Sequence, residues 1–220
     1  MNALGRRLLA EFIGTAVLLA TVVGSGIMGV ALSRGNDGIA LLANAGATAG
    51  ALYVLIVLFG PISGAHFNPV VTMAMRLRGE LDTRTALAYV AVQVIAAVVG
   101  VAIAHAMFGQ ALLQTGTHAR TGAALWLSEG IATFGLLLTI LLGARHRPGA
   151  LPALVAAWIF AAYWFTASTS FANPAVTFAR AWTQSFSGIR LIDVPAFACA
   201  QVIGAIVALL AASALIKRDD

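Results

Sequence analysis

Two short stretches of this chain are nearly alike and decide how it folds. They read His66-Phe67-Asn68-Pro69-Val70-Val71-Thr72 and Phe171-Ala172-Asn173-Pro174-Ala175-Val176-Thr177. Each contains an Asn-Pro pair followed by a mostly apolar run that is too short to cross a lipid bilayer. Proline suits the first turn of a helix, where its missing N–H would be unpaired anyway. Each stretch therefore predicts the start of a half-helix.

The two Asn-Pro pairs belong to an internal repeat that runs through the chain. They lie 105 positions apart (173 − 68), and two further matches surround them in the same order. Ala10-Glu11-Phe12-Ile13-Gly14-Thr15 matches Ser128-Glu129-Gly130-Ile131-Ala132-Thr133, and Gln93-Val94-Ile95-Ala96-Ala97 matches Gln201-Val202-Ile203-Gly204-Ala205. An ordered set of matches indicates duplication. We therefore expect one domain over 1–220, built from half-repeats at about 1–110 and 120–220.

The composition is that of a membrane protein. Of the 220 residues, 60% are hydrophobic and only 10% are charged, and the mean hydropathy is +0.94. A soluble domain of this size cannot bury so much apolar side chain. Most of the long apolar stretches reach the roughly 20 residues that a spanning helix needs. They cover about 8–30, 39–60, 86–108, 123–143, 151–168 and 194–215. The predicted fold class is an all-α membrane protein with six transmembrane helices and two re-entrant half-helices.

The order of these segments predicts an inverted repeat. Each half contains three spanning segments, an odd number, so the second half must cross the membrane in the opposite sense. The half-helices then enter from opposite sides and meet near the midplane, where their unpaired ends must be buried in protein or line a wet cavity.

The basic residues predict the orientation in the membrane. Nine of them fall on the side of the membrane that holds both termini and four on the other side, which predicts that both termini are cytoplasmic. The nine are Arg6, Arg7, Arg76, Arg78, Arg84, Arg145, Arg147, Lys217 and Arg218, and the four are Arg34, Arg120, Arg180 and Arg190.

Other function classes find little support in the sequence. The net charge of +5 comes from basic residues scattered over short loops, so we expect no nucleic-acid partner. The chain shows no Ser-His, HExxH or paired-carboxylate arrangement at a useful spacing, and we expect no enzyme activity. The single cysteine, Cys199, cannot form an internal disulfide or a metal cluster by itself. We expect neither a metal nor a cofactor.

Several polar residues in apolar surroundings are candidates for a functional site. A carboxylate is costly at membrane depth, so Glu11 and Glu129 are presumed functional. They are either proton-coupling groups of a transporter or buried acceptors for the N–H groups of the re-entrant loops. Asn68 and Asn173 can each cap a half-helix with the side-chain oxygen while the amide nitrogen faces the lumen.

Taken in order, these motifs resemble the aquaporin family over essentially the whole chain. The resemblance rests on Glu11 and Glu129, on Ser63 to Pro69, on Asn173 to Ala175, and on Gln93 and Gln201. It implies the aquaporin fold, with pore motifs formed by Asn68, Pro69 and Val70 in the first half and by Asn173, Pro174 and Ala175 in the second.

The resemblance also implies roles for the surrounding residues and for the whole protein. Glu11, Glu129, Gln93 and Gln201 would support the re-entrant loops, and His66 would lie beside the cytoplasmic end of the pore, either as a structural residue or as a pH gate. The family implies a homotetramer with one pore per subunit. Its setting would be the lipid bilayer of a bacterial-type inner membrane.

The outer constriction departs from the pattern of a water channel. Its four positions, counted from the two Asn residues, fall on Thr48, Ala161, Ser170 and Val176. A water channel is expected to have an aromatic residue, a histidine and an arginine among them, and this chain has none. Arg180, one helical turn beyond Val176, either anchors an external loop or partly replaces the missing charge.

Small side chains at these positions predict a wide passage for solutes larger than water. The segment from Ser168 to Thr177 resembles a bacterial aquaporin branch that is associated with arsenic-resistance operons. We therefore expect a passive channel for glycerol-like solutes and neutral metalloid acids such as arsenious acid, together with water. A water-selective aquaporin and an inverted-repeat secondary transporter are the alternatives.

Overall fold

The computed structural model describes residues 3–216 and is all-helical over that range. Lys217 and Arg218, two of the basic residues used to assign topology, lie outside the described residues. The long helices are α1 (Ala3–Ser33), α2 (Asp37–Ser63), α4 (Thr83–Met107), α5 (Ala123–His146), α6 (Leu151–Phe165) and α8 (Val194–Leu215). The two half-helices are α3 (Pro69–Leu77) and α7 (Pro174–Ala179). Three 3-10 turns complete the described chain, at Pro148–Ala150, Arg180–Trp182 and Leu191–Asp193.

The predicted six spanning helices and two half-helices are confirmed. All six long segments are long and apolar enough to cross a membrane, the fifth counted together with the 3-10 turn before it. The end of α6 at Phe165 is earlier than predicted, because the chain turns there into the second re-entrant loop. Local signals set other ends: Asn36 and Asp82 each accept a backbone N–H at the start of α2 and α4. Gly64 ends α2 in the left-handed conformation.

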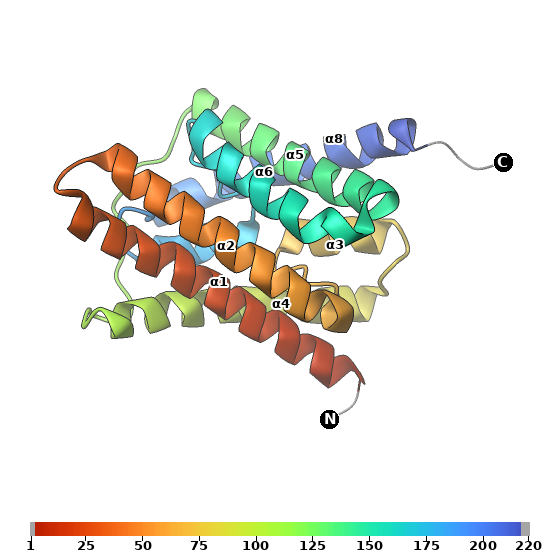
Figure 1. Ribbon diagram of the computed structural model, residues 1–220, viewed down its shortest axis with the longest axis horizontal. Helices are drawn as coiled ribbons and strands as arrows, with labels where there is room; N and C mark the ends of the chain where they lie inside the picture. The colour runs from red at the N-terminus through yellow and green to blue at the C-terminus, as the bar shows by residue number, and fades with distance from the viewer. Residues whose placement is uncertain (1–2, 217–220) are drawn as a thin grey trace.

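The helices pack as two equivalent sets. In the first half α1 packs against α2 and α4, and in the second half α5 packs against α6 and α8. The half-helix α3 lies against both α4 and α8, and α7 lies against the same two helices. The beginning of α1 and the end of α8 lie at the same end of the bundle (Figure 1). This is the arrangement expected of an inverted repeat with an even number of spans.

Two glycines bring helices of each half into backbone contact. A Cβ atom on Gly100 of α4 would lie 2.3 Å from the Ala16 carbonyl oxygen of α1, and one on Gly204 of α8 would lie 2.2 Å from the Gly130 oxygen of α5. Close approach through small residues is the main way in which helices associate within lipid. Gly46 and Gly50 of α2 have no atoms within 4 Å of such a Cβ and take no part in this packing.

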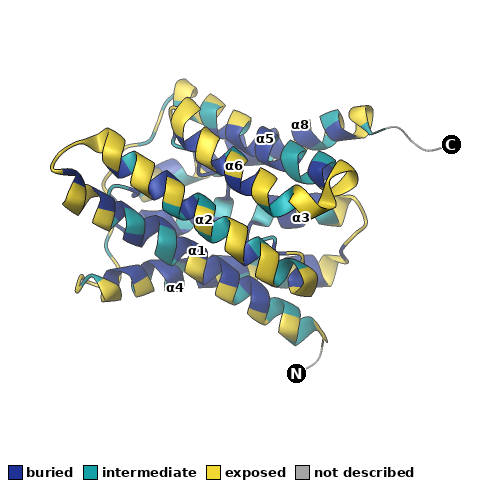
Figure 2. Ribbon diagram, in the orientation of Figure 1, coloured by how far each residue is buried: buried dark blue, intermediate teal, exposed yellow. Residues whose placement is uncertain are grey.

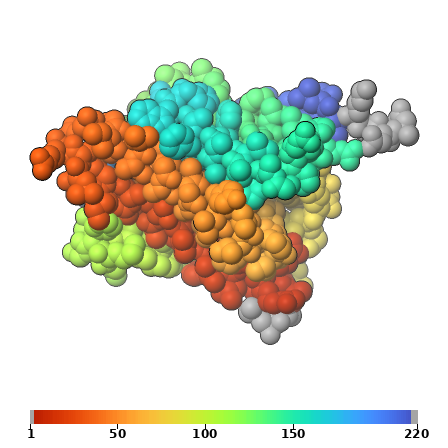
Figure 3. All heavy atoms as spheres, in the orientation of Figure 1, coloured from red at the N-terminus to blue at the C-terminus, as the bar shows by residue number. Residues whose placement is uncertain are grey.

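The outer and inner surfaces of the bundle differ in chemistry. Many large apolar side chains of the helices are exposed. The yellow segments of the ribbon in Figure 2 mark where exposed residues of all kinds lie. In the space-filling view the side chains of α1, α2 and α6 cover one face of the molecule (Figure 3). Buried polar residues, by contrast, gather inside, among them Glu11, Glu129, Gln93 and Gln201. An apolar exterior around a polar interior suits a protein surrounded by lipid.

Candidate functional site

A buried carboxylate holds the first re-entrant loop. Oε1 of Glu11 accepts hydrogen bonds from the Ser63 hydroxyl (2.7 Å) and the His66 backbone N–H (2.9 Å). Its Oε2 accepts from the Phe67 backbone N–H (2.7 Å) and from Nε2 of Gln93 (2.8 Å). Four donors on two oxygens satisfy a charge that lipid could not solvate. This geometry favours the acceptor interpretation of Glu11 over proton coupling.

The second half repeats the same bonding pattern. Glu129 accepts from the backbone N–H groups of Phe171 and Ala172 (both 2.9 Å) and from Nε2 of Gln201 (2.6 Å). Nε2 of Gln201 also donates to Oγ1 of Thr177 (2.8 Å), and the glutamine of the first half donates to the equivalent threonine. The structure thus brings together each Glu and Gln that the sequence singled out with the loop of its own half.

The backbone of both loops is held in an unfavourable conformation. Ala65 and Phe67 have φ angles of 51° and 48°, and Ser170 and Ala172, the residues 105 positions later, have φ angles of 50° and 48°. Left-handed backbone costs residues other than glycine about 1–2 kcal/mol each. This conformation turns successive N–H groups toward the carboxylates, and the resulting hydrogen bonds offset the strain.

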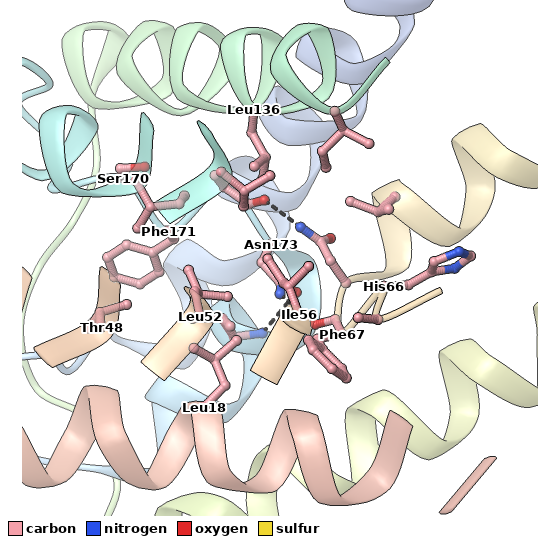
Figure 4. A pocket seen from close by; sticks show the side chains of 18 of the residues that line it. Leu18, Thr48, Leu52, Ile56, His66, Phe67, Leu136, Ser170, Phe171 and Asn173 are labelled. Atoms are coloured by element: carbon pink, nitrogen blue, oxygen red, sulfur yellow. Dashed lines mark hydrogen bonds between the residues drawn. The ribbon is translucent and has the colours of Figure 1, made fainter. Parts of the chain in front are cut away.

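The two Asn side chains join the loops to each other. Oδ1 of Asn68 accepts from the Val70 N–H (3.1 Å), and Asn173 caps α7 in the same way. Nδ2 of Asn68 donates to the Ala172 carbonyl oxygen (2.8 Å), and Nδ2 of Asn173 donates to the Phe67 carbonyl oxygen (2.8 Å). Figure 4 shows both bonds. Because an amide NH₂ has two donors, each Asn keeps one N–H for another acceptor.

A cavity of about 270 Å³ runs past this junction. In Figure 4 it extends from Ser170, Phe171 and Thr48 at one end, past Asn173, to His66 at the other. Its walls come from both halves: apolar side chains of α1, α2, α5 and α6 form much of the lining, and residues of the re-entrant loops form another part. The apolar lining includes Leu18, Val22, Leu52, Ile56, Leu136, Ile140, Val155 and Ile159.

Three of the four predicted constriction residues line this cavity, and one prediction is corrected. Thr48, Ser170 and Val176 are buried in its wall. Ala161 is exposed on the outer side of α6 and does not line the cavity, whereas Tyr163 does and donates from its hydroxyl to Oγ1 of Thr48 (3.3 Å). Residues two apart on a helix point about 200° away from each other. Counting back from the Asn-Pro pair therefore reached α6, but not the face of that helix that lines the cavity.

Two arginines lie near Phe171 and differ in their hydrogen bonds and in whether they line the cavity. Arg120, for which no role was predicted, bonds to the loops near Ser168 and Gly188. Its guanidinium donates to the carbonyl oxygens of Gly188 (2.8 Å), Ser168 (3.3 Å) and Phe186 (3.3 Å). Arg180, by contrast, lines the cavity. Tyr163 and Arg120 lie in no motif, and Phe171 begins the second Asn-Pro stretch but had no predicted role. Their contacts depend on how loops and helices pack.

His66 lies in the cavity wall toward the opposite end from Thr48. One of its ring nitrogens, Nδ1, is 3.1 Å from Oγ1 of Thr72, and its ring packs edge-on against Tyr89 at 5.4 Å between centroids. Burial, with a smaller contribution from the charge of Arg7, lowers the pKa of His66 to about 4. The imidazole is therefore neutral at physiological pH.

The fold consists of six apolar helices around a cavity, and two opposed half-helices frame that cavity. This arrangement defines an integral membrane channel. The chain belongs to the major intrinsic protein family, whose sequence profile matches residues 2–170. Members of this family that resemble the chain are channels and not enzymes, which settles the class of this protein.

Individual relatives agree with this assignment. The chain is 53% identical over 206 residues to the aquaglyceroporin AqpS of Rhizobium meliloti (strain 1021), a match that covers 94% of this chain and 88% of the relative. It is 32% identical over 146 residues to aquaporin PIP2-7 of Arabidopsis thaliana, covering 61% of this chain and 50% of that protein. The X-ray structure of the aquaglyceroporin from Plasmodium falciparum has the same fold, with a TM-score of 0.75, 17% identity and 94% of each chain covered. The chain is thus a multi-pass membrane protein of the aquaporin superfamily.

Removal of the second carboxylate should destabilise the protein. Glu129→Ala leaves the N–H groups of Phe171 and Ala172 without an acceptor, and an unsatisfied buried donor costs about 1–3 kcal/mol. We expect a lower thermal unfolding midpoint for the purified protein in detergent. Glu80→Ala, which removes an exposed carboxylate paired with Arg78, is the control and should change the midpoint little. An unchanged midpoint in Glu129→Ala would contradict this account of the loop.

The lowered pKa of His66 predicts a pH-independent channel over the physiological range. Burial disfavours the charged form, so the ring takes up a proton only as the pH falls toward about 4. Solute flux into proteoliposomes should be flat between about pH 5.5 and pH 8, with equal pH on both sides. If the solute flux instead changes at about pH 6.5, and this change is absent in His66→Gln, the ring titrates as an exposed histidine does.

Proposed function

We propose that this chain is a passive channel for small uncharged solutes larger than water. The solutes would be glycerol-like compounds and neutral metalloid acids such as arsenious acid, and water would pass as well. The 53% identity to an aquaglyceroporin supports the glycerol-like class. The resemblance of the segment from Ser168 to Thr177 to the arsenic-associated branch supports the metalloid acids.

The observation that carries this proposal is the cavity wall around Val176. That residue follows Asn-Pro-Ala, where a water channel is expected to have an arginine, and it lines the cavity with Thr48 and Ser170. These three side chains are small or medium in size and uncharged. Tyr163 replaces Ala161 in the proposed constriction, because its ring lines the cavity and its hydroxyl bonds to Thr48.

The polar and apolar parts of the passage wall fit the two kinds of surface that a polyol has. The free amide N–H groups of Asn68 and Asn173 would donate to passing hydroxyl or water oxygens. Leu52 and Ile56 of α2, with Leu18 of α1, would contact the carbon side of the solute. The facing N-termini of α3 and α7 bring positive dipole ends to the middle of the passage and disfavour cations and protons there.

The assembly and topology follow from the family resemblance and the charge distribution. We propose a homotetramer in which each subunit has its own pore, with both termini in the cytoplasm. The half-repeats at about 1–110 and 120–220 would act as one domain, because the Asn side chain of each half bonds to the loop of the other.

Stopped-flow light scattering of proteoliposomes tests the function directly. The expected result is rapid flux of water, glycerol and arsenious acid that rises linearly with the solute gradient and needs no ion gradient. Asn173→Leu, inserted to the same level, should lose this flux because it removes an amide and a loop-to-loop bond. Water flux without glycerol flux would support a water-selective aquaporin, and saturable, ion-dependent flux would support a secondary transporter.

An arginine at position 176 should make the channel more selective. Val176→Arg places a long charged side chain in the wall with Thr48 and Ser170, and its donors would bind passing oxygens. We expect water flux to remain while flux of glycerol and arsenious acid falls roughly tenfold or more, a change of about 1.4 kcal/mol in the barrier. Val176→Leu adds bulk without charge and is the matched control. Equal glycerol flux in Val176→Arg and the parent would show that position 176 is not at the constriction.

A further inference from the structure

Arg180 has an unusual position for a charged residue. It begins the 3-10 turn that follows α7, one helical turn past Val176, and only 2% of its surface is exposed. It lines the same cavity as Val176 and Ser170. Its Nε donates to the Ser187 carbonyl oxygen, and its guanidinium carbon lies 3.4 Å from the centre of the Phe171 ring. These two contacts fix the side chain within the cavity wall.

The charge of Arg180 is not neutralised by a partner. Within residues 3–216 it makes no ion pair, and its Nη1 atom is buried without a hydrogen-bond acceptor. Burial, and then the charge of Arg120, lowers the pKa of Arg180 to about 9, which leaves it protonated at neutral pH. Glu129 is the nearby carboxylate, and its oxygens already accept three hydrogen bonds from other groups. A buried cation with a free donor is costly unless a solvent or solute oxygen reaches it.

A second unpaired group lies in the same wall. The hydroxyl of Ser170 is buried and has no hydrogen-bond partner among the residues that the structure describes. Ser170 precedes Phe171, the residue whose ring lies against Arg180. Native proteins seldom leave buried polar groups unpaired, so two of them on residues that line one cavity are candidates for binding a ligand oxygen.

The anchoring role that an arginine could have in this region is filled by another residue. Arg120 uses its guanidinium nitrogens on three loop carbonyl oxygens and does not line the cavity. Arg180 makes one such bond, through Nε, and keeps its other donors. The two arginines therefore differ in their contacts: Arg120 bonds to three loop carbonyl oxygens, and Arg180 lines the cavity with its Nη1 unpaired.

We propose that Arg180 and Ser170 form a cationic oxygen-binding site at the outer constriction, which selects neutral, oxygen-rich solutes and rejects cations. Arg180 thus supplies, from one turn further along the chain, the charge that position 176 lacks. The solute class is that of polyols and undissociated oxyacids, whose hydroxyl oxygens accept from the guanidinium and the serine. This inference rests on the proposed channel function and names the groups that select its solutes.

The test measures cation exclusion beside neutral-solute flux in the same proteoliposomes. Arg180→Met removes the charge, and we expect proton and sodium leak, driven by a potassium diffusion potential, to rise about tenfold or more because one fixed cation leaves the passage. Arg180→Lys should retain the exclusion. Arg190→Met is the matched control: it removes an arginine of the same region that pairs with Asp193 outside the cavity, and its leak should equal that of the parent.

A rescue variant shows whether Arg180 acts through its charge in the passage or only supports the structure. Arg180→Gln keeps an N–H donor for the Ser187 carbonyl oxygen, and it serves as the neutral variant where Arg180→Met does not insert. Adding Val176→Arg to either neutral variant returns a guanidinium to the wall, and the cation leak should fall back toward the parent. A purely structural arginine would not be replaced in this way.

The outcomes distinguish this inference from the function on which it depends. No glycerol or water flux through the parent protein would overturn the proposed channel. Normal neutral-solute flux with an unchanged cation leak in Arg180→Met or Arg180→Gln would overturn only the role of Arg180. A high leak in Arg180→Lys, or no recovery on adding Val176→Arg, would also overturn it.

Discussion

The structure depends on the hydrogen bonds that two buried carboxylates accept from the re-entrant loops. Glu11 and Glu129 each receive two backbone N–H groups from a loop whose residues have positive φ angles. Without these acceptors the N–H groups would be unsatisfied in an apolar interior, and the left-handed backbone would have nothing to offset its strain. The loops set the positions of Asn68 and Asn173, so the polar lining of the cavity follows from the two carboxylates.

Duplication explains why so much of the fold is readable from the sequence. The ordered Glu, Asn-Pro and Gln motifs predict two equivalent halves, and the observed helix contacts repeat in the same way, with α1, α2, α3 and α4 corresponding to α5, α6, α7 and α8. The Glu–Gln–Thr hydrogen bonds of the two halves also match. A motif that occurs twice in a symmetric fold must serve the same local geometry twice. The motif residues could therefore be singled out as candidates from the sequence.

Other parts of the site were not predictable, for physical reasons. Counting residues from Asn173 gives a position along α6 but not the rotation of that helix, so Ala161 was named where Tyr163 lines the cavity. For Arg180 the sequence left two roles open, a loop anchor or a replacement for the missing charge. The choice depends on whether the side chain faces solvent or the cavity, which is set by the turn after α7 and by the packing of Phe171. Arg120 acts through carbonyl oxygens of distant loops, and backbone acceptors leave no sequence signal.

The crossed bonds of the two Asn side chains have a consequence for how the protein is made. Asn68 bonds to a carbonyl 104 residues further along the chain, and Asn173 bonds to one 106 residues earlier. At a synthesis rate of about 5–20 residues per second, the first half-helix waits roughly 5–20 s after translation before its partner loop exists. During that interval the first loop has only the bonds of its own half, which Glu11, Gln93 and Tyr89 make. The acceptor on α1 thus serves the first loop from within its own half, whereas the crossed bonds of the two Asn side chains need the complete chain.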